Sequence, residues 1–585
     1  MPRTPAPAAR LLAATMRPER SSAARIIAVL AVAMGLRLWM PVLLGQFVDD
    51  ALGGSELAAL TRIAVLYIIA ALLAEALQLG VLWASVKLSW RAGNRLRERL
   101  AAHALRLELG WHARHSPGQL IERIDGDVEA LGIFFANIVL TVGNALLVLG
   151  MLAFAFVIDI WAGVVLLAIV AVGLTLLVVQ RAAAVPAREA EREANAILYG
   201  DLEERLGGLE DLRANGAGDY AVHRLHANSS RAWRAARHAS WKGDSAYAIS
   251  AIAFGIGSAA TLALGYVLHQ RGAITVGAVL SLYRFADMLR APLERIAEQM
   301  KEFQKAFAGA RRAATMLATE PAVADGPRDD LPSGPLTVEL DDVTFSYRVG
   351  TPVLRNIDLR LEPGRHVGVI GRTGSGKTTI GRLLVRFWDV DCGAVRVGGI
   401  DVRELRLATL RRRIAIVTQD VELFDASLRD NLTLFGARSA TDDRLRAVLD
   451  DVGLADWVAT LPDGLDTHLA GTGGLSAGEG QLLAFARAFL SEPDVVVLDE
   501  ASSRLDPGTE ARIAAATHAL LAGRSALIIA HRLATLDEVD EIVVLEDGEI
   551  VERGPRGELG ADPSTRYARL LRISSEGMLL EDALA

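Results

Sequence analysis

A glycine-rich segment at residues 371–378, here called the phosphate loop, separates an apolar run from a segment with helical spacing. The run, Val367 to Ile370, is typical of a buried strand, and apolar residues then recur at helical spacing between 379 and 387. The loop fits the pattern G-x-x-x-x-G-K-[ST], in which backbone N–H groups and a helix N-terminus surround phosphate oxygens. Lys377 would reach the β- and γ-phosphates of ATP, and the Thr378 hydroxyl would hold Mg²⁺. The residues expected to contact the nucleotide here are Gly371, Arg372, Thr373, Gly374, Ser375, Gly376, Lys377, Thr378 and Thr379.

Acidic residues follow a second buried run farther along the chain. Residues 494–498 are nearly all apolar, as in a strand covered on both faces, and the run ends in Asp499 and Glu500. The carboxyl end of such a strand is where open parallel sheets bind ligands. Asp499 would complete the Mg²⁺ site, and Glu500 would position the attacking water. A further apolar run ends at His531, which would donate to the γ-phosphate.

The composition excludes several classes of protein. The chain has 585 residues, which is too long for one ordinary domain, and 51% are hydrophobic while 23% are charged. Such a mixture predicts an uneven distribution of apolar residues between a membrane part and a soluble part. The net charge of −8 argues against a nucleic-acid partner. The single cysteine, Cys392, excludes an internal disulfide framework.

The first half contains apolar stretches long enough to cross a bilayer, which takes about 20 residues. Arginines cluster at the amino terminus and in the charged segments after the second and fourth stretches, so the positive-inside rule places these segments and both termini in the cytoplasm. The soluble half would then also be cytoplasmic, on a multi-pass protein of the plasma membrane. The six predicted spans are about 26–48, 58–83, 131–158, 161–180, 245–268 and 273–290.

Polar residues inside these spans have two readings that the sequence leaves open. A charge at the bilayer centre is costly, so such side chains should face other helices or a wet cavity. They either line a transport path or pair with one another between helices. The residues concerned are Arg37, Glu75, Asn137, Asn144, Arg284 and Asp287.

Residues 319–335 hold four prolines and no periodicity, which predicts a linker. We therefore expect a multidomain chain: an all-α transmembrane domain of six helices at 1–318, the linker, an α/β P-loop NTPase domain at 336–575 and a tail at 576–585.

The soluble half resembles the nucleotide-binding domain of ABC transporters. The phosphate loop matches the Walker A motif, and Val495 to Asp499 matches Walker B. The resemblance implies that Glu500 is the catalytic carboxylate and His531 the switch histidine. It also implies that Gln419 is the Q-loop glutamine that senses Mg²⁺ and contacts the membrane domain. Further implied positions are Tyr347, stacking on adenine, and the D-loop Ser503-Arg504-Leu505-Asp506. The membrane half resembles the exporter type, with coupling helices near Leu109 to Leu120 and Arg213 to Tyr220.

This chain departs from the family pattern at residues 475–479, here called the signature segment. The family has Leu-Ser-Gly-Gly-Gln, and this chain has Leu-Ser-Ala-Gly-Glu. Ser476 and Gly478 survive, and the resemblance implies that they contact the nucleotide held by the opposite subunit. Ala477 adds a methyl group, and Glu479 brings a negative charge towards an anion. Upstream, residues 471–474 lack the acidic residue usual in exporters.

A single nucleotide domain in the chain requires a partner, because each ATP site of the family combines two such domains. The altered signature favours a second, different half-transporter over a homodimer. The expected function is ATP-driven export across the membrane, and the alternative is an ATP-gated or regulatory subunit that binds nucleotide without pumping. A small molecule, a lipid or a peptide all remain open as cargo.

Overall fold

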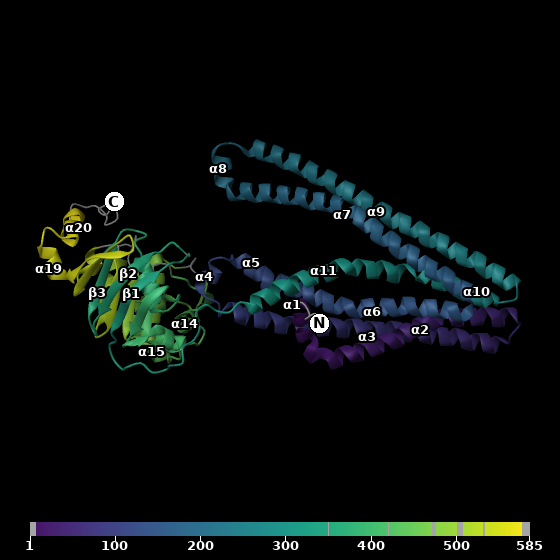
Figure 1. The fold of residues 1–585 in the computed structure, drawn as a ribbon, viewed down its shortest axis with the longest axis horizontal. Coiled ribbons are helices and arrows are strands. Elements are labelled where there is room, and N and C mark those ends of the chain that lie inside the picture. Colours follow the sequence, from purple (N-terminus) through teal and green to yellow (C-terminus); the bar gives the residue numbers. More distant parts are fainter. Residues whose placement is uncertain are drawn as a thin grey trace. The chain divides into compact units, whose positions relative to one another are not determined.

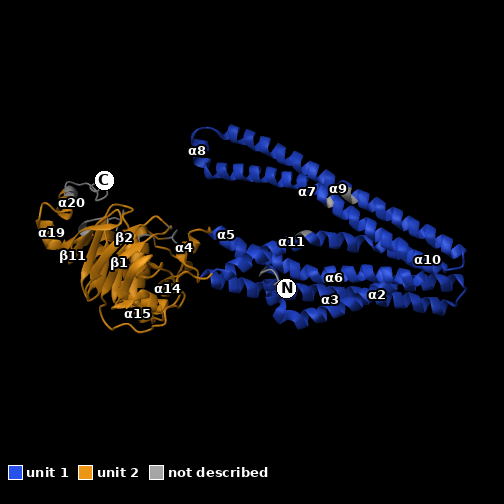
Figure 2. Ribbon diagram, viewed as in Figure 1, with its two compact units in different colours: residues 1–105, 117–319 blue, residues 106–116, 320–585 orange. Residues whose placement is uncertain are grey.

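The computed structural model describes residues 7–348, 350–418, 421–470, 475–499, 507–530 and 533–575. The chain divides into two compact units (Figure 2). Unit 1 contains residues 1–105 and 117–319, and unit 2 contains residues 106–116 and 320–585. The predicted fold class is confirmed: long helices come first, and an α/β domain follows.

Unit 1 is built from long antiparallel helices (Figure 1). Within the described residues, five helical segments are long and apolar enough to cross a membrane. Several continue well past bilayer thickness, since 53 residues of α9 extend about 80 Å. The helices are α1 (Pro7–Met16), η1 (Arg17–Glu19), α2 (Arg20–Leu52), α3 (Leu57–Ala104), α5 (Pro117–Ile121), η2 (Glu122–Gly126), α6 (Asp127–Ile158), α7 (Ile160–Gly207), α8 (Leu209–Ala214), α9 (Gly218–Gln270), α10 (Val276–Met288) and α11 (Arg290–Ala318).

The sixth predicted span, 273–290, coincides with α10, which has only 13 residues. The helix ends at Met288, and α11 begins two residues later. Asp49 at the end of α2 holds the start of α10, because its carboxylate accepts hydrogen bonds from Thr275 Oγ1 at 2.6 Å and Gly277 N at 2.7 Å. By length alone, this last segment is not among the membrane-spanning helices of the described residues.

Short polar joints reverse the chain between the long helices. Asp159 is the one non-helical residue between α6 and α7, and its side chain caps α7 by accepting hydrogen bonds from the backbone N–H groups of Trp161 and Ala162. At the opposite end, α7 and α9 are joined through the short helix α8 (Figure 1).

Unit 2 contains a six-stranded sheet in the order β12-β11-β3-β10-β9-β6 and a four-stranded sheet in the order β2-β1-β4-β5. In the larger sheet β11, β3, β10, β9 and β6 pair in parallel, so their carboxyl ends meet at one edge. The strands are β1 (Val338–Phe345), β2 (Leu354–Leu361), β3 (His366–Gly371), β4 (Cys392–Val397), β5 (Ile400–Asp401), β6 (Ile414–Val417), β7 (Asp425–Ser427), β8 (His468–Ala470), β9 (Val495–Asp499), β10 (Ser525–Ile529), β11 (Glu541–Glu546) and β12 (Glu549–Pro555).

Every residue of β9 and β10 is buried, as expected for parallel strands covered on both faces. Two apolar clusters supply this cover: one is formed mostly by helices, and the other by helices together with strands β1, β2 and β4 of the smaller sheet. The helices of unit 2 are α4 (Leu109–His112), α12 (Lys377–Leu384), η3 (Val402–Glu404), α13 (Leu407–Arg413), α14 (Leu428–Thr433), α15 (Asp442–Asp451), α16 (Ala455–Thr460), η4 (Gly464–Asp466), α17 (Ala477–Ser491), α18 (Pro507–Leu521), η6 (Leu533–Leu536), α19 (Arg556–Ala561) and α20 (Arg566–Ser575).

Residues 106–116, which interrupt the membrane half in sequence, pack with unit 2. Glu108 accepts a hydrogen bond from the backbone of Ala322 at 3.1 Å. The predicted linker is itself attached to unit 2, since Gly326 N donates to Leu405 O and Leu407 N donates to Asp325 Oδ1.

Candidate nucleotide site

The phosphate loop lies between the carboxyl end of β3 and the first turn of α12. Gly374 and Gly376 have φ values of +85° and +105°, which side-chain-bearing residues rarely adopt. Gly376 is also the N-cap of α12. The glycines therefore let the chain curl so that the helix begins at Lys377, with its partial positive charge at the loop.

The Lys377 side chain lies against the phosphate loop. The side chain is 4% exposed, and Nζ donates to the carbonyl oxygens of Gly371 at 2.7 Å and Arg372 at 2.9 Å. Ser375 is also buried, and its Oγ has no hydrogen-bond partner within the described part of the chain. A buried polar atom without a partner costs free energy, so this hydroxyl suits a loop that receives a polar ligand.

Thr378 and Asp499 meet at this end of the sheet, as the sequence predicted for a Mg²⁺ site. The Thr378 hydroxyl donates to Asp499 Oδ1 at 3.2 Å, although the two residues are 121 positions apart. Asp499 ends β9 and is 8% exposed. A hydroxyl and a carboxylate are oxygen ligands of the kind that Mg²⁺ takes beside nucleotide phosphates, so the residues fit this ion.

Tyr347 follows β1 and keeps 42% of its surface exposed. Its hydroxyl is hydrogen-bonded to Thr379 Oγ1 at 3.1 Å, which ties the ring to the first turn of α12. Phe345 and Trp388 contact the ring edge-to-face at centroid distances of 4.9 and 5.1 Å. The ring is thus fixed beside the phosphate loop and available to an adenine base.

The signature segment begins α17 with a reciprocal cap. Ser476 is the N-cap residue. Its hydroxyl oxygen accepts a hydrogen bond from Glu479 N at 3.3 Å, and its hydroxyl group donates one to Glu479 Oε2 at 2.8 Å. Glu479 Oε2 also accepts from Ser476 N at 2.9 Å. Gly478 is buried, and a Cβ there would lie 2.2 Å from Thr509 Cγ2, so only glycine fits. No hydrogen bond joins Ser476 to the phosphate loop in the described residues.

Arg487 joins α17 to the segment at residues 421–431 by hydrogen bonds. Its guanidinium donates to Asn431 O at 2.8 Å and to Glu422 O at 2.9 Å. Burial, with the nearby charge of Arg438, lowers the pKa of Arg487 from its ordinary value. The buried charge is compensated by carbonyl oxygens, which fixes the helix near residues 421–431.

Trp388 is a contact that sequence reasoning missed. The indole packs against Tyr347, and a Cβ on Gly110 would lie 3.0 Å from Trp388 Nε1. Gly110 belongs to α4, in the region predicted as the first coupling helix. Trp388 therefore touches both the candidate adenine ring partner and this short helix. An aromatic residue just after the phosphate-loop helix was the only signal in the sequence.

Four predicted elements of the site lie outside the described residues: Gln419, Glu500, His531 and the D-loop residues 503–506. Their strands are described: β6 ends at Val417, β9 at Asp499 and β10 at Ile529. Their assigned roles stay predictions.

Comparison with known proteins matches both halves of the chain to the same family. Residues 25–293 match the family model described as the ABC transporter transmembrane region, and residues 354–503 match the model described as ABC transporter. The chain is 31% identical over 539 residues to a fatty acid ABC transporter ATP-binding/permease protein of Mycobacterium bovis, covering 90% of this chain and 83% of the relative.

Two other relatives are named for different activities. An ATP-dependent lipid A-core flippase of Ralstonia nicotianae is 30% identical over 96% of this chain and 95% of its own length. A mycobactin import ATP-binding/permease protein of Mycobacterium tuberculosis is 34% identical over 86% of this chain and 58% of its own length.

The matched ranges cover most of both units. The chain belongs to the ABC transporters, as an exporter-type half-transporter in which a multi-pass membrane region is fused to an ABC ATPase domain that is coupled to transport.

Proposed function

We propose that this chain hydrolyses ATP with Mg²⁺ and uses the energy to export an amphiphile with an acidic headgroup. The observation that carries the ATPase part is the hydrogen-bonded pair of Thr378 and Asp499 next to the buried Lys377, on the same chain as long apolar helices.

Each residue has a distinct role in the proposed reaction. Lys377 offsets charge on the β- and γ-phosphates, and Thr378 and Asp499 hold the metal ion. Mg²⁺ would supply neutralisation of the charge that develops on the phosphate oxygens. Glu500 orients the attacking water, and His531 donates to the γ-phosphate. Gln419 links the metal site to the membrane region.

The chain acts with a second half-transporter, and we favour a different chain over a second copy. The hydroxyl of Ser476 is engaged by Glu479, which weakens what this signature segment offers to the opposite ATP. The joint of α7, α8 and α9 exposes large apolar side chains, which indicates a surface that a partner covers. Those residues are Leu206, Leu209, Tyr220 and Val222. A stable homodimer with full ATPase activity, purified from the chain expressed alone, would contradict this assignment.

The membrane topology follows from the basic residues. Arginines cluster at the amino terminus and in the carboxyl-terminal halves of α3 and α7. By the positive-inside rule these segments lie in the cytoplasm, together with unit 2 and both termini, on a protein of the plasma membrane.

A pocket of about 250 Å³ supports the cargo assignment. It lies between α2, α3 and α10 and is lined by Arg37, Glu75 and Arg284 together with apolar side chains such as Met40 and Met288. Arg37 Nη2 lies 2.6 Å from Glu75 Oε1. Arg284 Nη1 lies 3.4 Å from Asp287 Oδ2, so each guanidinium group already has a carboxylate partner. Ionisable residues within apolar helices mark substrate paths, and an acid with an apolar tail would compete with these carboxylates for the two guanidinium groups. Two of the relatives named above carry fatty acid or lipid A-core in their names.

Transport into inside-out vesicles tests the proposal. Purified transporter should accumulate a labelled long-chain fatty acid in the lumen when ATP and Mg²⁺ are supplied, and Lys377→Ala should abolish accumulation. Arg37→Gln should raise the KM for the acid by about tenfold and leave basal ATP hydrolysis within about twofold, since one charge-assisted hydrogen bond is removed.

Arg62→Gln is the matched control, because Arg62 is an exposed arginine of α3 outside the pocket. Equal effects of the two substitutions, or accumulation of a neutral fatty alcohol at the same rate as the acid, would contradict an acidic cargo. ATP hydrolysis without any accumulation would favour a regulatory subunit.

A further inference from the structure

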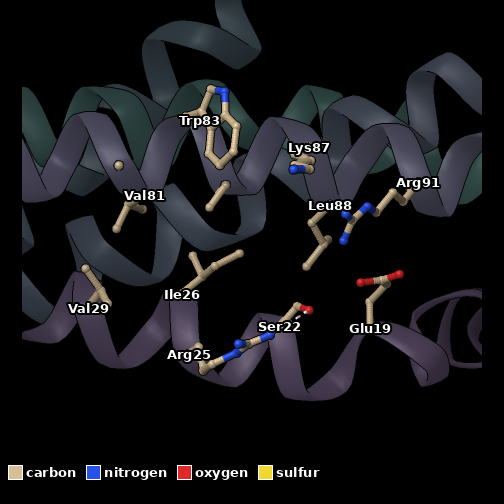
Figure 3. A pocket seen from close by; sticks show the side chains of 12 residues that line it. Glu19, Ser22, Arg25, Ile26, Val29, Val81, Trp83, Lys87, Leu88 and Arg91 are labelled. Carbon is tan, nitrogen blue, oxygen red and sulfur yellow. Dashed lines mark hydrogen bonds between the residues drawn. The ribbon is translucent and has the colours of Figure 1, made fainter.

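A second pocket, of about 440 Å³, lies between the start of α2 and the middle of α3 within unit 1 (Figure 3). Its volume is within the range of ligand pockets, about 300–1,000 Å³. One end of the pocket is apolar, with Val29 and Val81, and the other end holds Arg91 and Glu19, with Lys87 and Arg25 between the two ends (Figure 3). The pocket thus has the two chemical halves of an amphiphile.

The register of the two helices explains this division. Trp83, Lys87 and Arg91 are spaced by four residues on α3, so they share one face of the helix. Arg25 directly precedes the apolar part of α2, which runs antiparallel to α3. Tryptophan and basic residues at the end of an apolar stretch mark the depth of lipid headgroups. In the proposed topology this depth is the cytoplasmic leaflet.

Among the described residues, the basic side chains of this pocket lack a carboxylate of their own. Glu19 is the lining carboxylate, and it is already bound to Arg95 Nη2 at 2.8 Å. In the described residues no carboxylate lies within salt-bridge distance of Arg25, Lys87 or Arg91. Arg25 instead contacts the Ser22 hydroxyl at 3.5 Å, and Lys87 Nζ lies 4.6 Å from the centroid of the Trp83 ring.

An occupant must therefore bring negative charge and apolar surface together. A free phosphate would satisfy the basic residues and leave the apolar end uncovered. A neutral lipid would cover the apolar end and bring no counter-charge to Arg25, Lys87 and Arg91. An anionic phospholipid does both, because its phosphate accepts charge-assisted hydrogen bonds while an acyl chain removes apolar surface from water.

We propose that this pocket binds one anionic phospholipid of the surrounding membrane. Its phosphate lies against Arg25, Lys87 and Arg91, and an acyl chain lies along Ile26, Val29 and Val81. The site is distinct from the proposed cargo pocket, because Arg25 and Arg37 are separated by about 18 Å along α2. Binding needs neither ATP nor transport, so the proposal stands or fails independently of the cargo.

Lipid titration of the delipidated full transporter, followed by native mass spectrometry, tests the basic side chains. The wild type should bind phosphatidylglycerol at least about tenfold more tightly than phosphatidylcholine with the same acyl chains. The triple variant R25Q/K87Q/R91Q should lose this preference, with phosphatidylglycerol affinity reduced about a hundredfold, since each basic residue near an anionic surface contributes about fivefold.

The matched control is R231Q/R234Q/K242Q, which removes the same charge from exposed positions of α9 and should change the affinity by less than about twofold. Basal ATP hydrolysis shows that both variants are folded. An equal loss of phosphatidylglycerol affinity in the two triple variants would show an effect of general surface charge and would contradict a specific site. Displacement of the lipid by inorganic phosphate would overturn the lipid assignment.

A filling substitution tests the apolar end without altering any charge. Gly80 lines the pocket, and a Cβ there meets no heavy atom within 4 Å, so Gly80→Leu fits the fold and occupies the space of the acyl chain. It should weaken phosphatidylglycerol binding by about tenfold, because the acyl chain then buries less apolar surface. Gly35→Leu on α2, where a Cβ is equally unobstructed, is the control and should have no effect. An unchanged affinity in Gly80→Leu would overturn the proposed acyl-chain position.

Discussion

The phosphate loop and the signature segment both begin a helix, yet their polar side chains are arranged differently. In the phosphate loop the Ser375 hydroxyl has no partner among the described residues, and the Lys377 ammonium lies on two carbonyl oxygens. In the signature segment, the Ser476 hydroxyl and the Glu479 carboxylate are hydrogen-bonded to each other at the start of α17.

The difference shows that the two halves of an ATP site contributed by one chain are not equally prepared for a phosphate. An anion entering the phosphate loop gains donors that the chain leaves to it. An anion approaching Ser476 meets a hydroxyl already directed at a carboxylate, and that carboxylate repels it. This asymmetry supports a partner chain whose signature segment completes the site of this chain.

The largest expected effect is on the phosphate loop. Lys377→Ala removes the ammonium group that is proposed to lie against the β- and γ-phosphates, so ATP hydrolysis should fall by about 10³-fold. Steady-state phosphate release from the purified transporter measures it. Arg382→Ala, at an exposed position of α12, is the control and should keep near wild-type activity. If Lys377→Ala retained ATP hydrolysis, the phosphate loop would not be the phosphate-binding half of the site, and its comparison with the signature segment would fail.

The metal half of the same site comes next. Asp499→Asn keeps the shape of the side chain and the hydrogen bond from Thr378, but it removes the negative charge offered to Mg²⁺. Hydrolysis should fall by about 10²-fold, and excess Mg²⁺ should restore part of it. Binding of a fluorescent ATP analogue without Mg²⁺ should not change. A loss of that binding would mean that Asp499 supports the fold of the loop rather than the metal ion.

Tyr347 tests how the base is held beside the phosphates. Tyr347→Ala should raise the KM for ATP by about tenfold, since stacking of a base on an aromatic ring contributes about 1–3 kcal/mol. Tyr347→Phe keeps the ring and removes only the hydrogen bond to Thr379, so its KM should stay within about threefold of wild type. Equal effects of both substitutions would assign the role to the hydroxyl.

Sequence reasoning placed the phosphate loop and the Thr378–Asp499 pair because parallel strands bring their carboxyl ends to one edge. It also placed the long apolar helices, whose pattern is local. It expected a coupling helix near Leu109 to Leu120 but counted these residues within the transmembrane domain, whereas residues 106–116 belong to unit 2, where Gly110 approaches Trp388 across 278 positions. It treated Glu479 as a repulsive charge and missed the cap, although Ser-x-x-Glu is the sequence pattern of a capping box.

The sixth span shows a different limit. Residues 273–290 are apolar enough to suggest a membrane helix, but hydropathy does not show where a helix stops. The structure ends α10 at Met288 and starts α11 at Arg290, and Leu289 between them has helical dihedral angles, so the predicted stretch corresponds to α10 and its junction with α11. The register between α2 and α10, which Asp49 fixes, is likewise absent from any local pattern.

The smallest expected effect addresses the signature segment. Glu479→Gln preserves the reciprocal cap, since glutamine serves at the same position of a capping box, but it removes the negative charge. ATP hydrolysis by the complete dimer should rise by about twofold to fivefold, because the partner's ATP then meets Ser476 without a facing carboxylate. Glu558→Gln, an exposed carboxylate of α19, is the charge-matched control. A rise in both variants would show a general charge effect, whereas no rise in either would mean that Glu479 is a helix cap without influence on the partner's site.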